Sequence, residues 1–147
     1  MKIYLARPIS GHSYDEIVDY YERTSAFLKH IGYQVLSPMT GKEVLRNEIQ
    51  FKSEGYQNPV STNHAVIERD RWMVDTSNIV YANLIDSKHV SIGTTMELAW
   101  GHDKGKHTIV AMEKDNIHRH AFIIESADVI FETNEDALNY LSFLIQK

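Results

Sequence analysis

The residues best suited to chemistry lie in the segment 91–97, Ser-Ile-Gly-Thr-Thr-Met-Glu, which follows a predicted strand and opens a predicted helix. A helix N-terminus presents unpaired N–H groups and a partial positive charge, so Ser91, Gly93 and Thr94 are suited to binding an anion such as phosphate. Glu97 adds a carboxylate one turn further on. The spacing from Thr94 to Glu97 also fits a capping box, in which the carboxylate only satisfies backbone N–H groups. The spacing alone leaves both interpretations open.

A second carboxylate, Asp70, lies on the predicted helix that precedes this strand, between Arg69 and Arg71. As a solvated charge paired with either arginine, it would have no catalytic consequence. Two carboxylates that meet at the strand ends would instead suit cleavage of a glycosidic bond, where one acts as nucleophile or stabiliser and the other as proton donor. The sequence does not show whether Asp70 and Glu97 meet.

The loop after the first predicted strand is a further candidate for binding an anion. Ser10 and Gly11 permit close backbone approach, and Arg7 can form a bidentate pair with a phosphate or with the polar edge of a base. Ser13 and Glu16 have the spacing of a capping box for the helix that follows. The chain has neither a Walker loop nor a GxGxxG pattern, so the usual markers of ATP and NAD binding are missing.

Composition narrows the classes of protein and site. Fifteen basic and twenty acidic residues give a net charge of −5, which disfavours binding to duplex nucleic acid. The absence of cysteine excludes disulfides, a thiolate nucleophile and zinc sites built on sulfur. Eight histidines occur without an HExxH pattern, and His118-Arg119-His120 is too sparse to predict a metal site. We therefore expect no metal and no cofactor.

The elements that must position these residues follow from short apolar runs that alternate with segments of helical period. The predicted strands are Ile3–Ala6, Gln34–Leu36, Asn78–Leu84, His107–Met112 and Asp128–Phe131. The predicted helices are Tyr14–His30, Asn63–Ser77, Thr94–Lys104 and Glu135–Ile145. This alternation predicts an α/β fold, a Rossmann-like, doubly wound, five-stranded parallel sheet flanked by helices, as a single domain over residues 1–147.

Open parallel sheets bind ligands beyond the carboxyl ends of their strands, so the loops that follow the strands matter most. The long stretch 37–62 is predicted to be a functional lid, with Met39, Phe51 and Tyr56 shaping a pocket. Four large aromatic residues are predicted to be in the core: Trp72, Trp100, Phe122 and Phe143. The chain shows no signal sequence and no apolar run long enough to span a membrane, so we expect a cytoplasmic protein.

Several of these motifs occur together in one known family. They are Lys2-Ile3-Tyr4-Leu5-Ala6, Asp70 followed by the segment 75–80, the segment 91–101 with its Gly-x-x-x-Glu-Leu-Ala-Trp-Gly pattern, and Lys104-Gly105-Lys106. Over its full length the chain resembles the nucleoside 2-deoxyribosyltransferase superfamily, particularly its nucleoside 5′-monophosphate N-glycosidase branch.

The resemblance implies roles for particular residues. Glu97 would be the nucleophile that attacks the anomeric carbon, Asp70 the acid that assists the departing base, and Tyr4 the hydroxyl that orients Glu97. A serine at position 91, where base-exchanging relatives tend to have an acid, implies a 5′-phosphate on the substrate. The remaining phosphate contacts would be Ile9, Ser10, Gly11, Gly93 and, from a neighbouring subunit, His120. Arg7 and Pro8 replace smaller residues of the family's loop and would contact the base or other parts of the substrate.

The expected function is therefore hydrolysis of a pyrimidine nucleoside 5′-monophosphate, with CMP or hydroxymethyl-CMP favoured, to free base and pentose 5-phosphate. Glu97 is expected to be ionised, because it lies near a helix N-terminus. A 2′-deoxyribosyltransferase that exchanges bases and a non-catalytic nucleotide-binding module are the alternatives. The resemblance also implies a homodimer, or a higher homo-oligomer, with a shared active site, and no partner that is a nucleic acid or a membrane.

Overall fold

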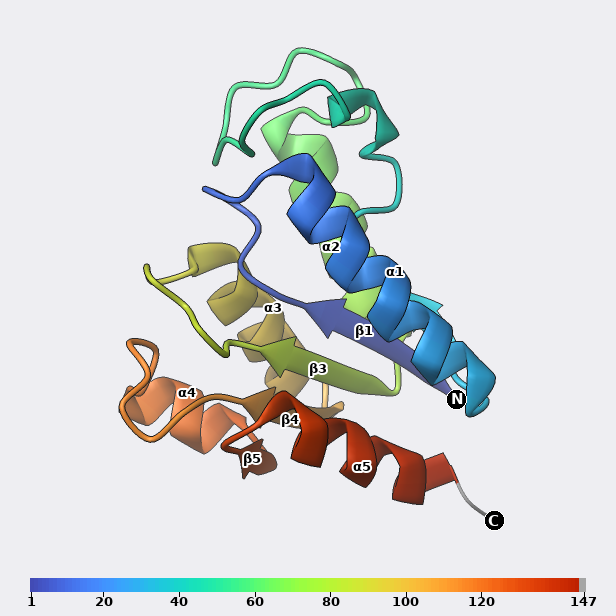
Figure 1. Cartoon of the computed structure of the whole chain (residues 1–147), viewed down its shortest axis with the longest axis vertical. Helices are drawn as coiled ribbons and strands as arrows, with labels where there is room; N and C mark the ends of the chain where they lie inside the picture. The colour runs from blue at the N-terminus through green and yellow to red at the C-terminus, as the bar shows by residue number, and fades with distance from the viewer. Residues whose placement is uncertain (146–147) are drawn as a thin grey trace.

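Short apolar runs alternate with amphipathic segments along the chain, and they fold into a five-stranded parallel sheet between two layers of helices (Figure 1). The computed structural model describes residues 1–145, so the last two residues of the predicted domain lie outside the described residues. The strands are β1 (Lys2–Ala6), β2 (Gln34–Leu36), β3 (Ile79–Asn83), β4 (His107–Ala111) and β5 (Val129–Phe131). The helices are α1 (Tyr14–His30), η1, a 3-10 turn (Glu43–Leu45), α2 (Asn63–Thr76), α3 (Ile92–Asp103), α4 (Ala121–Ser126) and α5 (Asn134–Ile145).

The strand order is β2-β1-β3-β4-β5, and every neighbouring pair is parallel. The chain therefore winds outward in one direction from β1 to β2 and in the other from β3 to β5, which confirms the predicted doubly wound sheet. The strand order reverses at β1 and β3, which pair from Ile3 opposite Ile79 to Ala6 opposite Ala82. A crevice is expected beyond the carboxyl ends of these two strands.

The two faces of the sheet bury different helices, because successive side chains of a strand point to opposite faces. Ile3 and Leu5 pack in the layer under α1 and α5, the two helices in front of the sheet in Figure 1. Tyr4 and Ala6 pack in the opposite layer, which contains Met73 and Val74 of α2, Leu98 of α3 and Ile123 of α4. The alternation therefore places the Tyr4 ring on the face that carries α2 and α3.

The predicted strands and helices agree with the observed ones to within two residues at each end. Two differences matter. Helix α3 begins at Ile92 rather than Thr94, because Ser91 is its N-cap and its hydroxyl accepts a hydrogen bond from the N–H of Thr94 at 3.3 Å. Helix α4 was not predicted; it has only six residues, too few to establish a helical period in the sequence. The predicted capping box of Ser13 and Glu16 at the start of α1 is confirmed.

The prediction that four large aromatic residues belong to the core is wrong for three of them. Trp72, Phe122 and Phe143 are 62%, 78% and 68% exposed, and only Trp100 packs, half-buried, against the core. The buried positions of α2 near Trp72 are Met73 and Val74, so the indole lies on the outer face of that helix. The aromatic residue type predicted burial, but each helix is oriented so that these side chains face solvent.

Candidate active site

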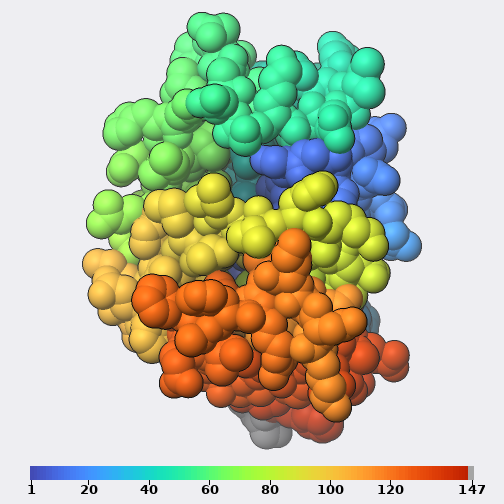
Figure 2. Space-filling view, turned by 90° about the vertical axis from the view of Figure 1, so that its left-hand side faces the viewer, coloured from blue at the N-terminus to red at the C-terminus, as the bar shows by residue number. Residues whose placement is uncertain are grey.

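A cavity of about 680 Å³ opens at the carboxyl end of β1, between the loop that follows this strand, the segment 37–62, α2 and the start of α3. Figure 2 shows its surroundings from outside: segment 37–62 (teal to green) faces the start of α3 (yellow), and the N-terminal part of the chain (blue) is visible between them. Most of the residues predicted to do chemistry line this one cavity. The predicted site residues that line the cavity are Arg7, Pro8, Ile9, Ser10, Gly11, Asp70, Ser91, Gly93, Thr94 and Glu97.

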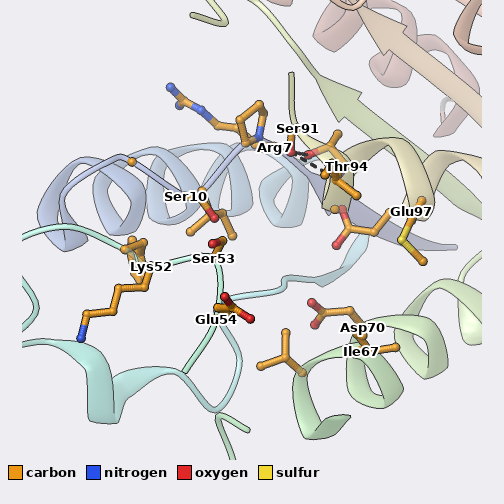
Figure 3. A pocket seen from close by; sticks show the side chains of 18 of the residues that line it. Arg7, Ser10, Lys52, Ser53, Glu54, Ile67, Asp70, Ser91, Thr94 and Glu97 are labelled. Carbon is orange, nitrogen blue, oxygen red and sulfur yellow. Dashed lines mark hydrogen bonds between the residues drawn. The ribbon is translucent and has the colours of Figure 1, made fainter. Parts of the chain in front are cut away.

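Glu97 lies in the second turn of α3 and is buried. Its Oε1 accepts a hydrogen bond of 2.7 Å from the hydroxyl of Tyr4, which comes from β1 and is fully buried. The Thr94-to-Glu97 capping box is therefore wrong. Ser91 caps the helix, and the Glu97 carboxylate points into the cavity (Figure 3).

Asp70 reaches the same cavity from α2, and its carboxylate also points inward in Figure 3. It is buried rather than solvated, which removes the interpretation of Asp70 as a surface charge. Arg69 Nε lies 3.8 Å from Asp70 Oδ1, too far for a hydrogen bond, and this buried oxygen has no hydrogen-bond partner among residues 1–145. Buried carboxylate oxygens are normally hydrogen-bonded, so this unpartnered oxygen is an exception of the kind found at catalytic sites.

The two carboxyl groups influence each other's ionisation. Burial and, after it, the charge of Asp70 raise the pKa of Glu97 to about 8, although the hydrogen bond from Tyr4 acts in the opposite direction. Burial also raises the pKa of Asp70, and the positive charges of Lys42 and Arg69 partly offset this. Strongly coupled acids titrate as a pair, and we expect this pair to hold one proton near neutral pH. The prediction that a helix N-terminus keeps Glu97 ionised is therefore wrong, because Glu97 is deep in the cavity, beyond the first turn.

The start of α3 forms the second part of the site. The first N–H groups of a helix have no intrahelical partner, and Ser91 caps only that of Thr94, so the N–H groups of Ile92 and Gly93 are available to an anion. The hydroxyl of Ser91 also donates to Thr94 Oγ1 at 3.0 Å. Ser10, in the loop after β1, directs its hydroxyl into the same cavity (Figure 3). This end of the cavity thus offers neutral donors to an anion.

Two buried side chains and the half-buried Glu113, to none of which the sequence assigned a role, hold the start of α3 in place. The N–H of Ser91 donates a hydrogen bond of 2.7 Å to Nε2 of His118, which is buried. The His118 Nδ1 lies 3.1 Å from Oδ1 of Asn116, and Asn116 in turn donates to the carbonyl of Leu84 at 2.7 Å and to the carboxylate of Glu113. Burial lowers the pKa of His118, which keeps the ring neutral and able to accept from Ser91.

Two predicted contacts do not point toward the two carboxylates in this chain. The guanidinium of Arg7 lies 4.3 Å from the centre of the Tyr20 ring and points away from the two carboxylates, although Arg7 borders the cavity (Figure 3). His120 is outside the cavity: it is the exposed N-cap of α4, and its Nδ1 accepts from the N–H of Phe122 at 3.2 Å. A role for His120 in phosphate binding would require a second subunit.

The predicted lid, segment 37–62, covers the end of the cavity near Asp70. Phe51 and Tyr56 line the cavity as predicted, whereas Met39 packs against the core. The segment also contributes two buried polar residues that the sequence did not indicate, Lys42 and Ser61. Neither lies in a periodic element, so no sequence pattern signalled its burial.

Within residues 1–145 no group of three or more His, Asp or Glu side chains is arranged to hold a metal ion. In the same range no helix has the length and apolar character needed to cross a bilayer.

The family model for nucleoside 2-deoxyribosyltransferase matches residues 3–141. No curated protein matches the chain.

Three solved structures share the fold. A 2-deoxyribosyltransferase from Bacillus psychrosaccharolyticus superposes with a TM-score of 0.69 at 22% identity, over 95% of this chain and 92% of that one. The 2-deoxyribosyltransferase of Leishmania mexicana has a TM-score of 0.63 at 18% identity, over 97% of each chain. A CMP N-glycosidase from Clostridium botulinum has a TM-score of 0.61 at 15% identity, over 98% of this chain and 99% of that one. The match of the family model over nearly the whole chain, on this fold, shows that the protein belongs to the nucleoside 2-deoxyribosyltransferase family.

Proposed function

We propose that the protein hydrolyses the N-glycosidic bond of a pyrimidine nucleoside 5′-monophosphate and releases the base and a pentose 5-phosphate. The observation that carries this proposal is the arrangement along α3. Free N–H groups at Ile92 and Gly93 lie about one helical turn, roughly 6 Å, before Glu97. That separation is comparable with the span of a ribose 5-phosphate from phosphorus to C1′. An anion at the start of α3 would therefore place C1′ beside the Glu97 carboxylate.

The first step starts from the form of the pair in which the shared proton has moved from Glu97 to Asp70. The ionised carboxylate of Glu97 then attacks C1′ and forms a glycosyl ester. The C1′–N1 bond breaks, its electron pair stays with the base, and the base takes the proton held by Asp70. Tyr4 donates to Glu97 Oε1, which favours the ionised carboxylate and fixes the direction of its other oxygen. One shared proton on the Asp70–Glu97 pair supplies both the nucleophile and the acid.

In the second step, Asp70, now ionised, removes a proton from water. The hydroxide oxygen attacks C1′, the ester bond to Glu97 breaks, and the pentose 5-phosphate leaves. Asp70 has regained the proton that it gave to the base, so the sum of the two steps is hydrolysis of one nucleotide by one water.

Two features support a nucleotide rather than a free nucleoside. The hydroxyls of Ser91 and Ser10 lie at the start of α3 and in the loop beside it, where an acid would repel a phosphate. The other acid of the lining, Glu54, is exposed and belongs to segment 37–62. The likeness to the CMP N-glycosidase and the resemblance of the segment 91–101 to that branch support a pyrimidine, with CMP or hydroxymethyl-CMP as the first substrates to test.

Base exchange is the second candidate, because two of the structural neighbours are named as deoxyribosyltransferases. A transferase would pass the glycosyl group from Glu97 to the nitrogen of a second base instead of to water. Incubation with a nucleotide and an excess of another base separates the two activities. Hydrolysis gives the pentose 5-phosphate, whereas exchange gives a new nucleotide.

We also propose that the working unit is a homodimer or a larger homo-oligomer. His120 lies outside the cavity of its own chain and would complete the anion site of a neighbour. Exposed apolar side chains suited to contact with a second copy occur at the cavity, at Val90, Ile92 and Met96, and beside His120 in the chain, at Ile117 and Phe122.

The deciding experiment follows products by chromatography after incubation with CMP, hydroxymethyl-CMP, dCMP, dUMP, the purine monophosphates and cytidine. We expect base and pentose 5-phosphate from a pyrimidine nucleotide, and much slower cleavage of cytidine. Glu97→Ala should abolish turnover while nucleotide binding persists. Base release by Glu97→Ala at the parent's rate would rule out the mechanism. Equal cleavage of cytidine and CMP would rule out the phosphate requirement. If the parent protein binds nucleotides without turnover, it is a binding module.

A further inference from the structure

Lys42 is a buried cation that the proposed chemistry does not yet use. It lies in segment 37–62, is only 7% exposed, and lines the cavity. Its backbone N–H is bonded to the carbonyl of Met39 and its carbonyl to the N–H of Leu45, at 3.0 and 2.9 Å, so the chain is fixed on both sides of the residue. Lysine is almost never buried to this extent without a partner for its charge.

The charges around Lys42 are those of the proposed catalytic acids. Burial lowers the pKa of Lys42, and the charges of Asp70 and, more weakly, Glu97 oppose this effect. No carboxylate of residues 1–145 lies within 4.0 Å of its Nζ, so the attraction acts across the cavity rather than through an ion pair. Lys42 and Asp70 thus line the same cavity, and the ammonium group keeps its donors free.

The neighbouring arginine does not line the cavity and so does not substitute for Lys42, although its buried Nε and Nη2 also lack hydrogen-bond partners among residues 1–145. Arg69 Nη1 donates a hydrogen bond of 2.9 Å to the carbonyl of Val60, which ties segment 37–62 to α2. Gly41 permits this close approach, because a Cβ at that position would lie 2.9 Å from Arg69 Nη1. Lys52 is also different: it is exposed, lies 3.7 Å from Glu48, and its ammonium group points away from both carboxylates (Figure 3).

The position of Lys42 indicates which part of a nucleotide it meets. An anion at the start of α3 and C1′ beside Glu97 leave the base on the side of Asp70 and segment 37–62. In a pyrimidine the carbonyl next to the glycosidic nitrogen, O2, is an acceptor that gains negative charge as the C1′–N1 bond breaks. A fixed ammonium group within a cavity is suited to stabilise that charge.

We propose that Lys42 is a further substrate-contacting residue, which donates a hydrogen bond to O2 of the pyrimidine and so favours bases with a carbonyl beside the glycosidic nitrogen. This inference rests on the proposed function and on its orientation of the nucleotide. As the C1′–N1 bond breaks, the electron pair moves to N1 and is delocalised onto O2, where the Lys42 N–H strengthens its hydrogen bond. No proton leaves Lys42, since the base receives its proton from Asp70.

The test combines a change in the protein with a change in the ligand. The parent and Lys42→Met are compared on CMP and on 2-thio-CMP, in which a sulfur that accepts hydrogen bonds poorly replaces O2. We expect Lys42→Met to lower kcat/KM for CMP by about 10- to 100-fold, which is the range for loss of a hydrogen bond to a charged group. The kcat/KM for 2-thio-CMP should change by less than about threefold. Lys29→Met, at an exposed lysine near the end of α1 that does not line the cavity, is the matched control and should alter neither value by more than about threefold.

A purely structural role for Lys42 predicts a different pattern. Lys42→Met would then lower kcat/KM equally on both ligands, and that result would overturn the proposal while leaving the hydrolase function intact. Because the chain has no cysteine, Lys42→Cys can be alkylated selectively with 2-bromoethylamine, which restores an ammonium group at nearly the same position. We expect this treatment to recover most of the activity on CMP, and no recovery would contradict the role of the charge.

Dissociation constants separate failure of this inference from failure of the proposed function. If the parent releases no base from any nucleotide, the hydrolase function is wrong, and calorimetric titration with CMP and 2-thio-CMP still tests the contact. Lys42→Met should then weaken binding of CMP by about tenfold and leave that of 2-thio-CMP nearly unchanged. Equal dissociation constants for parent and variant, or no binding of CMP by the parent, would overturn the contact as well.

Discussion

Burial gives Glu97, Asp70 and Tyr4 properties that none of them has in water. The raised pKa values of the two acids mean that the empty site holds a proton at a pH where free carboxyl groups would have lost theirs. Tyr4 is itself held protonated, because burial and the charge of Glu97 raise its pKa well above the usual value. It therefore remains a hydrogen-bond donor across the physiological range.

The shared proton predicts a bell-shaped pH dependence of kcat/KM. Below the lower pKa of the Asp70–Glu97 pair both acids are protonated and the nucleophile is lost. Above the upper value, about 8 from the shift on Glu97, both are ionised and the acid is lost. Activity should therefore fall as the pH rises through about 8 and also as it falls into the acid range. Rates on a pyrimidine nucleotide between pH 4 and 10 measure this, and a rate that keeps rising beyond pH 9 would contradict it.

Tyr4→Phe should lower kcat/KM by roughly 10- to 100-fold, because it removes one hydrogen bond to a buried charged group and leaves the packing of the ring intact. The same change should shift the alkaline limb of the pH profile upward, since the hydroxyl lowers the pKa of Glu97. Steady-state rates across pH provide the check. Tyr33→Phe, which removes a buried hydroxyl bonded to the carbonyl of Leu141 on the other face of the sheet, is the control and should leave the profile unchanged.

Sequence patterns located some of these residues and missed others for a physical reason. Glu97, Asp70 and Ser91 lie on or beside periodic helices, so their approximate positions followed from the order of the elements, and the family resemblance added Tyr4. Lys42 lies in an irregular segment, and His118 lies in the connection between β4 and α4. Their burial depends on contacts with distant parts of the chain, which local periodicity does not encode.

At the scale of elements, α3 is the centre of the site, because it carries both the proposed anion site and Glu97. Its start is fixed from outside the helix: the hydrogen bond from Ser91 to His118 connects it to the segment after β4, and the N–H of Asp86 donates to Glu113 at 2.7 Å. Its middle is fixed against the sheet. The helix therefore acts as a rigid support on which the two functional groups keep their separation.

His118→Leu should weaken the anion site more than the chemistry. It keeps the bulk of the side chain but removes the acceptor for the Ser91 N–H, so we expect the KM for a nucleotide to rise about tenfold with kcat changed by less than about threefold. His118→Gln, whose amide oxygen can accept the same bond, should keep a KM nearer that of the parent. A fall in kcat at unchanged KM in His118→Leu would contradict this role.

Gly101→Ala should destabilise the protein through the contact of α3 with β3. A Cβ at Gly101 would lie 2.7 Å from Cγ2 of Val80, so the helix would have to move away from the sheet. Overpacking of this kind costs about 1–3 kcal/mol, partly offset by the better helix propensity of alanine, and we expect Tm to fall by roughly 3–6 °C. Gly93→Ala is the matched helical control, since nothing lies within 4 Å of the added Cβ, and its Tm should not fall. Equal thermal melting curves for the two variants would contradict the close packing.

The fold itself was largely predictable because each strand is a short apolar run between clear helical segments. The exceptions were the start of α3, where the sequence suggested a capping box from Thr94 and the structure has Ser91 as the N-cap, and α4, which is shorter than the window that a helical period requires. In the structure the Ser91 hydroxyl accepts a hydrogen bond from the Thr94 N–H, which identifies Ser91 as the N-cap of α3. Capping is decided by backbone geometry, which the spacing of Thr94 and Glu97 alone does not show.

At the scale of the whole molecule, the proposed shared site makes a prediction about mixed subunits. If His120 serves the neighbour's cavity, Glu97→Ala and His120→Ala chains should complement each other. In a mixed dimer, the site that contains the intact Glu97 would receive the intact His120 from the other chain. Random pairing of equal amounts should restore about a quarter of the parent activity, because half of the dimers are mixed and each has one working site.

The measurement uses the two chains expressed together and, for comparison, each alone. Analytical ultracentrifugation of the parent gives the size of the assembly under the same conditions. A monomer at assay concentration, or activity in the mixture equal to the mean of the two separate variants, would rule out a site completed by His120.

The hydrogen bonds of His118 also make it a spectroscopic reporter. Because Ser91 donates to Nε2, the ring must carry its hydrogen on Nδ1 and direct it to Asn116 Oδ1, which is the less common tautomer of a neutral histidine. The two ring nitrogens should therefore give widely separated 15N resonances that need no added probe. An anion that pulls on the first turn of α3 would change the Ser91 hydrogen bond and shift the Nε2 signal, so occupancy of the site can be followed without turnover.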